Sequence, residues 1–302
     1  MQALSRLANV GETRRVLERH GLMTKKALGQ HFLVNDGIVR HICDLAELDS
    51  DDVVVEVGPG IGTLTVALLQ RAGKVVSIEM DTDLPRVLFE TCADWKDSFS
   101  LISGDALGVG PDQMPEVAGE RLAPNKLVSN LPYAVGATIV LDYFQRYQSL
   151  ESCTVMVQAE VADRMAAKLG TKNYGAYTVK LGLYANYVDR FPVSEGNFFP
   201  PPRVKSAVIR MDRKRDDIPR ELRDAACLMA DAAFATRRKT ISNSCKTFFG
   251  NPANAATDVV ELLPSIFEQA GVSPKDRGES LPLETYLALG QAYLDQRAQL
   301  GV

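Results

Sequence analysis

The sequence lacks a long apolar segment, and its first residues lack the pattern of a secretory leader. No stretch of its 302 residues approaches the ~20 consecutive apolar residues needed to span a bilayer, which argues against a membrane-spanning protein. Residues 1–21 lack the apolar centre of a signal peptide. We therefore expect a cytoplasmic protein that has no membrane partner.

The chain also has few residues that form disulfides or bind metals. Its five cysteines are scattered and form no C-x-x-C pair, which is typical of reduced, mostly buried thiols. The three histidines, His20, His31 and His41, lack the spacing of metal ligands. We predict no bound metal.

The chain also has no excess of positive charge, because its net charge is −4. This balance argues mildly against nucleic-acid binding, but net charge hides local clusters. Three basic clusters are present, and they fit either solvated surface or phosphate contacts. They are Arg14, Arg15, Arg19, Lys25 and Lys26; Arg203, Lys205, Arg210, Arg213, Lys214 and Arg215; and Arg237, Arg238, Lys239 and Lys246.

Strand and helix patterns alternate from Val53 to about Gln158, which predicts a mostly parallel, doubly wound α/β sheet. After a polar linker at 212–217 the patterns are helical only. We expect an extension with one helix at 1–24, an α/β domain at 25–212 and a helical domain at 213–302. Strands are expected at 53–57, 74–81, 100–106, 126–133, 153–158, 188–192 and 204–211, and C-terminal helices at about 219–235, 238–249, 256–270 and 283–298.

The stretch Val53–Thr65 reads VVVEVGPGIGTLT, a buried strand followed by three glycines and the start of a helix. Glycine permits tight turns and lets a ligand approach the main chain closely. The spacing G-x-G-x-G differs from the dinucleotide fingerprint, so the pattern fits a nucleotide-binding turn or a purely structural one.

Two acids follow the next predicted strands. Glu79 lies about 20 residues beyond the glycine turn, where a carboxylate accepts ribose hydroxyls, although a solvated strand end is the alternative. Asp105 fits equally well a hydrogen bond to an adenine amino group and a turn cap. Because ligands bind beyond the carboxyl ends of parallel strands, we expect both acids in one crevice.

The segment Asn130-Leu131-Pro132-Tyr133 ends the fourth predicted strand. Proline fixes the turn, the asparagine and backbone oxygens are acceptors, and tyrosine offers a flat face for a base. Amino methylation of adenine needs acceptors for the amine hydrogens, because they favour a tetrahedral nitrogen whose lone pair can attack a methyl sulfonium. A proline turn with a core tyrosine is the alternative.

Taken together, these segments resemble the bacterial small-subunit ribosomal RNA adenine dimethyltransferases over about residues 25–298. The resemblance implies a Rossmann-like methyltransferase sheet and a small C-terminal helical RNA-binding domain. The segments that carry it are LGQHFL at 28–33, EVGPGIGTLT at 56–65, IEMD at 78–81, GDA at 104–106, NLPY at 130–133, FPPPRVKSAVIR at 199–210, FATRRKTISNS at 234–244 and RGESL at 277–281.

The resemblance implies S-adenosyl-L-methionine as cofactor. The implied cofactor contacts are His31, Leu33, Gly58, Gly60, Glu79, Asp105 and Asn130, and the implied catalytic residues are Asn130, Leu131, Pro132 and Tyr133. Position 31 is a histidine where the family often has asparagine, so this contact runs through the backbone or a ring nitrogen.

The implied substrate is 16S rRNA within the small ribosomal subunit, where the family converts two adjacent adenosines near the 3′ end to dimethyladenosines. We expect a monomer. The implied RNA contacts are Arg203, Lys205, Arg237, Arg238 and Lys239. Salt bridges within the protein are the alternative role for residues 237–239.

Three other functions remain open at the level of sequence. A related large-subunit methyltransferase that confers antibiotic resistance fits residues 234–240 and 277–281 less well. A non-catalytic assembly factor would not need the intact strand-end residues. A small-molecule methyltransferase would not need a basic helical domain.

Overall fold

The chain folds into two units in the computed structural model, which describes residues 3–22, 30–254 and 259–299. The first unit comprises Met1–Ala162 and Asn186–Arg213, and the second comprises Asp163–Ala185 and Lys214–Val302. Residues 163–185 therefore group with the C-terminal helices, an association that the sequence analysis did not anticipate. The predicted loop at 25–33 lies largely outside the described residues.

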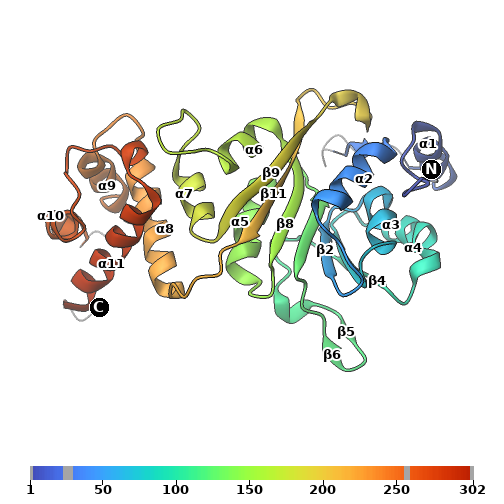
Figure 1. Ribbon diagram of the computed structural model, residues 1–302, viewed down its shortest axis with the longest axis horizontal. Coiled ribbons are helices and arrows are strands. Elements are labelled where there is room, and N and C mark those ends of the chain that lie inside the picture. The colour runs from blue at the N-terminus through green and yellow to red at the C-terminus, as the bar shows by residue number, and fades with distance from the viewer. Residues whose placement is uncertain (1–2, 23–29, 255–258, 300–302) are drawn as a thin grey trace. The chain divides into compact units, whose positions relative to one another are not determined.

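A seven-stranded sheet organises the first unit (Figure 1). Its five consecutive strands β4, β3, β2, β7 and β8 are parallel, and β11 runs antiparallel to β8, which confirms the predicted mostly parallel sheet. In order across the sheet, the strands are β4 (Phe99–Ser103), β3 (Lys74–Glu79), β2 (Val53–Val57), β7 (Lys126–Asn130), β8 (Ser152–Gln158), β11 (Ser206–Arg213) and β9 (Ala185–Val193).

The order of the strands reverses between β2 and β7, because the chain builds outward from β2 to β4 and then returns to the other side of β2. Crevices form outside the carboxyl ends of the strands at such a switch point. The glycine turn follows β2 and Asn130 ends β7, so the fold places both predicted features at this position.

The central strands β2, β3, β7 and β8 are buried on both faces, as expected for parallel strands. Val54 packs in a core cluster with helices α2 and α3, while the adjacent Val55, which points to the opposite face, is also fully buried. The helices of this unit are α1 (Val10–Arg19), α2 (Asp36–Leu45), α3 (Thr63–Leu69), α4 (Pro85–Thr91) and α5 (Gly136–Arg146), with short 3-10 helices at Ala93–Trp95, Pro111–Gln113 and Glu195–Asn197. Helix α6 (Ala159–Met165) begins in this unit and ends in the second.

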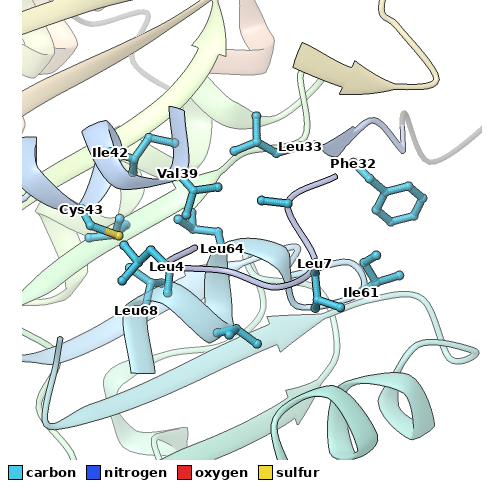
Figure 2. Packing of buried hydrophobic residues seen from close by; sticks show 14 of the residues in the cluster. Leu4, Leu7, Phe32, Leu33, Val39, Ile42, Cys43, Ile61, Leu64 and Leu68 are labelled. Carbon is cyan, nitrogen blue, oxygen red and sulfur yellow. The ribbon is translucent and has the colours of Figure 1, made fainter. Parts of the chain in front are cut away.

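The N-terminal segment packs directly on this core. Figure 2 shows Leu4 close to Cys43 of α2 and Leu68 of α3, and Leu7 close to Ile61. Asn9 caps α1 by accepting the N–H of Glu12 at 2.8 Å. The predicted extension with one helix is therefore part of the first unit.

Two short strand pairs were not predicted. β1 (Phe32–Leu33) pairs antiparallel with β10 (Phe198–Phe199), which joins segments far apart in sequence. β5 (Glu116–Val117) and β6 (Glu120–Arg121) form a hairpin that projects from the sheet (Figure 1).

The described residues of the second unit form helices and loops, apart from Ala185, which begins β9. Its core contains Met229, Phe249, Phe267 and Tyr286. Gly290 lets α11 approach α8 closely, because a Cβ there would lie 2.7 Å from the backbone nitrogen of Ala226. The elements are α7 (Ala176–Gly182), α8 (Arg220–Phe234), α9 (Ile241–Phe249), α10 (Val259–Gln269) and α11 (Leu283–Gln299), with 3-10 helices at Pro252–Asn254 and Gly278–Ser280.

Within the described ranges of both units, no helix is sufficiently long and apolar to cross a bilayer. All five cysteines are buried free thiols. Burial raises the pKa of Cys43, Cys92, Cys227 and Cys245 to about 12, so these thiols remain protonated at neutral pH.

Candidate active site

The glycine turn lies between two other predicted site segments. Gly58 and Gly60 adopt φ angles of 67° and 62°, a region that favours glycine. A Cβ on Gly60 would lie 3.0 Å from Phe32 Cε1, and one on Gly58 would lie 3.5 Å from Pro132 Cγ. The turn therefore packs against residues of the 30–33 and 130–133 segments.

Glu79 connects β3 to this turn. Its Oε2 accepts the N–H of Gly60 at 3.2 Å, and its Oε1 accepts the N–H of Asp81 at 2.8 Å. Burial raises the pKa of the carboxyl, while these N–H groups act in the opposite direction. Since each carboxylate oxygen accepts more than one hydrogen bond, Glu79 can also accept two hydroxyls.

A second glutamate, Glu56, lies fully inside the unit beneath the turn. Its Oε2 accepts hydrogen bonds from Thr65 Oγ1 at 2.7 Å and from Ser77 Oγ at 2.8 Å. Burial is the largest influence on the carboxyl and raises its pKa to about 7. Glu56 thus joins the strand before the turn to α3 and β3, a role that we did not predict from the sequence.

Asp105 lies two residues beyond the end of β4 and is exposed. Its Oδ1 accepts the N–H of Leu107 at 3.0 Å, which is the turn-capping interaction that the sequence analysis left open. The proposed contact with adenine would use the other carboxylate oxygen.

Asn130 is the last residue of β7, and its side-chain amide has a defined orientation. Its Nδ2 donates to the main-chain carbonyl of His31 at 3.3 Å. The acceptor Oδ1 is therefore the amide atom left for a ligand. Leu131 donates its N–H to Met156 O at 3.0 Å, and Pro132 O accepts the N–H of Gly136 at 3.0 Å, which fixes the backbone of the segment on both sides.

Tyr133 is half-buried and is held at both ends. Its hydroxyl lies 2.6 Å from Ser206 Oγ, and its ring stacks with the His31 ring at a centroid distance of 6.0 Å. Burial raises the pKa of the Tyr133 hydroxyl, so it stays protonated. His31 Nδ1 lies 2.8 Å from Pro200 O, which requires a proton on Nδ1 because the carbonyl can only accept.

Ser206 and Pro200 were not among the site residues predicted from sequence. Both belong to the 199–210 segment. The resemblance includes this segment, but its sequence does not show which of its atoms contact Tyr133 and His31. Leu33, which was predicted to contact the cofactor, is buried in the core, so only its backbone is available.

The predicted RNA contacts divide into two groups. Arg203 and Lys205 lie between β10 and β11 and are exposed. In the second unit, Arg237 is held by Glu279 at 3.3 Å and by the carbonyls of Lys172 and Tyr174. Over the described residues, no hydrogen bond or ion pair occupies the side chains of the exposed Arg238 and Lys239.

The residues at the switch point fit a nucleoside-containing cofactor. A glycine turn permits close approach of a ligand to the main chain, and Glu79 provides acceptors for a ribose. The buried hydroxyl of Thr63, which follows the turn, has no hydrogen-bond partner within the described part of the chain and can donate to a ligand.

Comparisons with known proteins agree on one family. A family model described as "Ribosomal RNA adenine dimethylase" matches residues 21–271. The chain is 36% identical over 298 residues to a protein of Acidothermus cellulolyticus named "Ribosomal RNA small subunit methyltransferase A", with 97% of each chain covered. A protein of the same name from Corynebacterium diphtheriae is 36% identical over 299 residues, with 96% of each chain covered.

Solved structures show the same fold. A dimethyladenosine transferase from Plasmodium falciparum matches with a TM-score of 0.69 at 23% identity, covering 90% of this chain and 99% of that chain. The 23S rRNA methyltransferase ErmE matches with a TM-score of 0.60 at 23% identity, covering 86% of this chain and 98% of that chain.

Proposed function

The chain belongs to the ribosomal RNA adenine dimethylase family, and we propose that it dimethylates two adjacent adenosines near the 3′ end of 16S rRNA in the small ribosomal subunit. It is an rRNA adenine dimethyltransferase. The relatives named for the small subunit, which align over nearly the whole chain, favour this substrate over large-subunit RNA. Its role would lie in ribosome biogenesis, in the cytoplasm.

The cofactor in this proposal is S-adenosyl-L-methionine, which supplies a methyl group on an electrophilic sulfonium. Gly58 and Gly60 would line its path along the main chain, and Glu79 would accept the ribose hydroxyls. Asp105 would accept the adenine amino group. Asn130, His31 and the backbone of Leu33 would complete the contacts near the methyl donor.

One observation carries the proposed chemistry: the amide of Asn130 is oriented by His31 O, so Oδ1 is available as an acceptor. Asn130 Oδ1 and the carbonyl of Leu131 would accept the two amine hydrogens of the target adenine. This draws the nitrogen toward tetrahedral geometry and frees its lone pair for attack. Each transfer would form one N–C bond, break the S–C bond of the sulfonium and release one proton from the amine to solvent.

Tyr133 would stack on the target adenine and hold it against these acceptors. Its hydroxyl is held by Ser206, which limits rotation of the ring. After the first methylation only one N–H remains, so the amine must rotate about its bond to the ring before the second transfer. Pro132 would keep the turn rigid through both steps.

RNA would be bound by exposed cations in both units. Arg203 and Lys205 in the first unit, with Arg238 and Lys239 in the second, would contact backbone phosphates of folded RNA. Arg237 would lie beside these phosphate contacts, with its guanidinium paired with Glu279 of the same unit. The enzyme would act as a monomer on the small subunit.

The proposal is tested by incubating the protein with small ribosomal subunits that lack these methyl groups and with methyl-labelled S-adenosyl-L-methionine. Mapping of the labelled nucleotides should find two neighbouring dimethyladenosines near the 3′ end of 16S rRNA. Label on purified large subunits, or on neither subunit, would contradict it.

A further inference from the structure

Helix α1 belongs to a segment that is fastened to the catalytic unit, which makes it a fixed support for surface residues. Leu4 and Leu7 are buried in the core (Figure 2). The backbone N–H of Ser5 donates to Asp36 Oδ1 at 2.8 Å, and Arg6 donates to Thr91 O at 2.9 Å. A side chain on the outer face of α1 therefore has a defined place on this unit.

The arginines of α1 differ in how their charges are compensated. Arg15 pairs with Glu12, and Arg19 pairs with Glu90 at 2.5 Å. Arg14 is exposed, and no carboxylate in the described residues pairs with it. Its guanidinium instead lies over the ring of Phe199, with Cζ 5.0 Å from the ring centroid.

Phe199 connects Arg14 to the active site through a short chain of contacts. It pairs with Phe32 across β1 and β10, and the next residue, Pro200, accepts the hydrogen bond from His31 Nδ1. His31 O in turn orients Asn130. The segment that begins at Phe199 also exposes Arg203 and Lys205.

The chemistry of this arrangement matches a phosphodiester. A guanidinium that stacks on an aromatic ring is pre-oriented, and its remaining N–H groups form a fork that fits two phosphate oxygens. We propose that Arg14, supported by Phe199, binds a backbone phosphate of the RNA strand that carries the target adenosine. This inference rests on the proposed function and assigns α1 a role in holding the substrate.

The test compares Arg14→Gln with the matched control Arg15→Gln, using small ribosomal subunits that lack the methyl groups. Arg14→Gln should raise KM about fivefold near 0.15 M salt and leave kcat, cofactor affinity and the melting temperature unchanged. Loss of one phosphate contact should also reduce the slope of log affinity against log salt by about 0.7 to 0.9. Arg15→Gln should match the unaltered protein in every measurement.

A second variant, Arg14→Lys, keeps the charge but loses the planar fork. It should retain the salt slope and still raise KM about twofold. An unchanged KM and an unchanged salt slope in Arg14→Gln would overturn this inference but not the proposed function. A loss of cofactor affinity or of stability as large as the change in KM would also overturn it, because such a loss indicates a structural role. Failure of the unaltered protein to methylate small subunits would overturn the proposed function and this inference with it.

Discussion

Residues at the strand ends of the first unit and the basic residues 237–239 of the second are both proposed to contact RNA. They differ in whether contacts within the protein fix their side chains. Asn130 and Tyr133 are each oriented by hydrogen bonds within their unit. Arg238 and Lys239 are exposed, and no hydrogen bond or ion pair fixes their side chains within the described ranges. Methyl transfer needs reacting atoms in a defined geometry, whereas attraction between a cation and phosphate tolerates a mobile side chain.

Arg237 is the exception that sharpens this contrast. It lies beside two exposed cations, but its guanidinium contacts Glu279 and two backbone carbonyls of the same unit. Adjacent residues in one basic run can therefore differ in role: Arg237 makes contacts within its own unit, whereas Arg238 and Lys239 are proposed to contact RNA.

The largest effect should come from Asn130→Ala, which removes the oriented acceptor. Transfer should fall on the order of 100-fold in kcat, comparable to loss of one group that stabilises a transition state. Affinity for S-adenosyl-L-methionine, measured by calorimetry, should change by less than about threefold. The control Asn186→Ala alters an exposed residue of β9 and should leave both values unchanged. An equal loss of transfer and of cofactor affinity would show that Asn130 mainly binds the cofactor.

Glu56→Gln tests the buried support beneath the glycine turn. Folded Glu56 holds its proton up to a pKa of about 7, compared with an ordinary value of 4.5, so its contribution to stability is lost as pH rises between these values. Glutamine does not ionise. The free energy of unfolding of the variant, relative to the unaltered protein, should therefore rise by roughly 2 kcal/mol from pH 5 to pH 8.

Denaturant titrations at several pH values measure this difference. The control Glu120→Gln replaces an exposed glutamate of β6 and should track the unaltered protein across the range. A difference for Glu56→Gln that stays constant from pH 5 to pH 8 would show that Glu56 is already ionised in the folded unit.

Reversing the exposed charges tests the other side of the comparison. Arg238→Glu with Lys239→Glu should weaken binding to small subunits about tenfold and leave unfolding unchanged, because neither side chain stabilises the fold. Arg237→Ala should instead lower the free energy of unfolding by about 1 kcal/mol through lost hydrogen bonds. If Arg237→Ala weakened subunit binding as much as the double reversal without loss of stability, the distinction between these neighbours would be wrong.

The smallest effect should come from the support of Tyr133. Ser206→Ala or Tyr133→Phe removes one hydrogen bond and should raise KM for the subunit about threefold. Because both changes remove the same interaction, the double variant should be no worse than either single variant. The control Tyr133→Ala removes the stacking ring and should cost clearly more. Additive effects of Ser206→Ala and Tyr133→Phe would mean that the two groups act separately.

The sheet was predictable because its strands are apolar, β-branched runs separated by helical patterns, as in Val53–Val57. The strand pairs β1–β10 and β5–β6 could not be predicted, because a strand of two residues is too short to show an alternating pattern. The association of residues 163–185 with the C-terminal helices was missed for a different reason: it depends on contacts between segments distant in sequence.

The same division applies to the site. Strand ends at Glu79 and Asn130 could be located from the sequence, because the carboxyl ends of parallel strands meet at one edge. The partners that orient them could not. Asn130 reaches the carbonyl of His31 across 99 positions, and His31 in turn reaches Pro200 across 169, so only the folded chain reveals these contacts.

The bond from Asn130 to residue 31 uses a peptide oxygen, which every amino acid possesses. Natural variation at position 31 can therefore change the ring that faces Tyr133 while the amide keeps its orientation. A saturation library would record tolerance at this position and would miss the contact altogether. Part of the arrangement that would align the substrate thus depends on the path of the main chain. Such a contact does not constrain which amino acid stands at position 31.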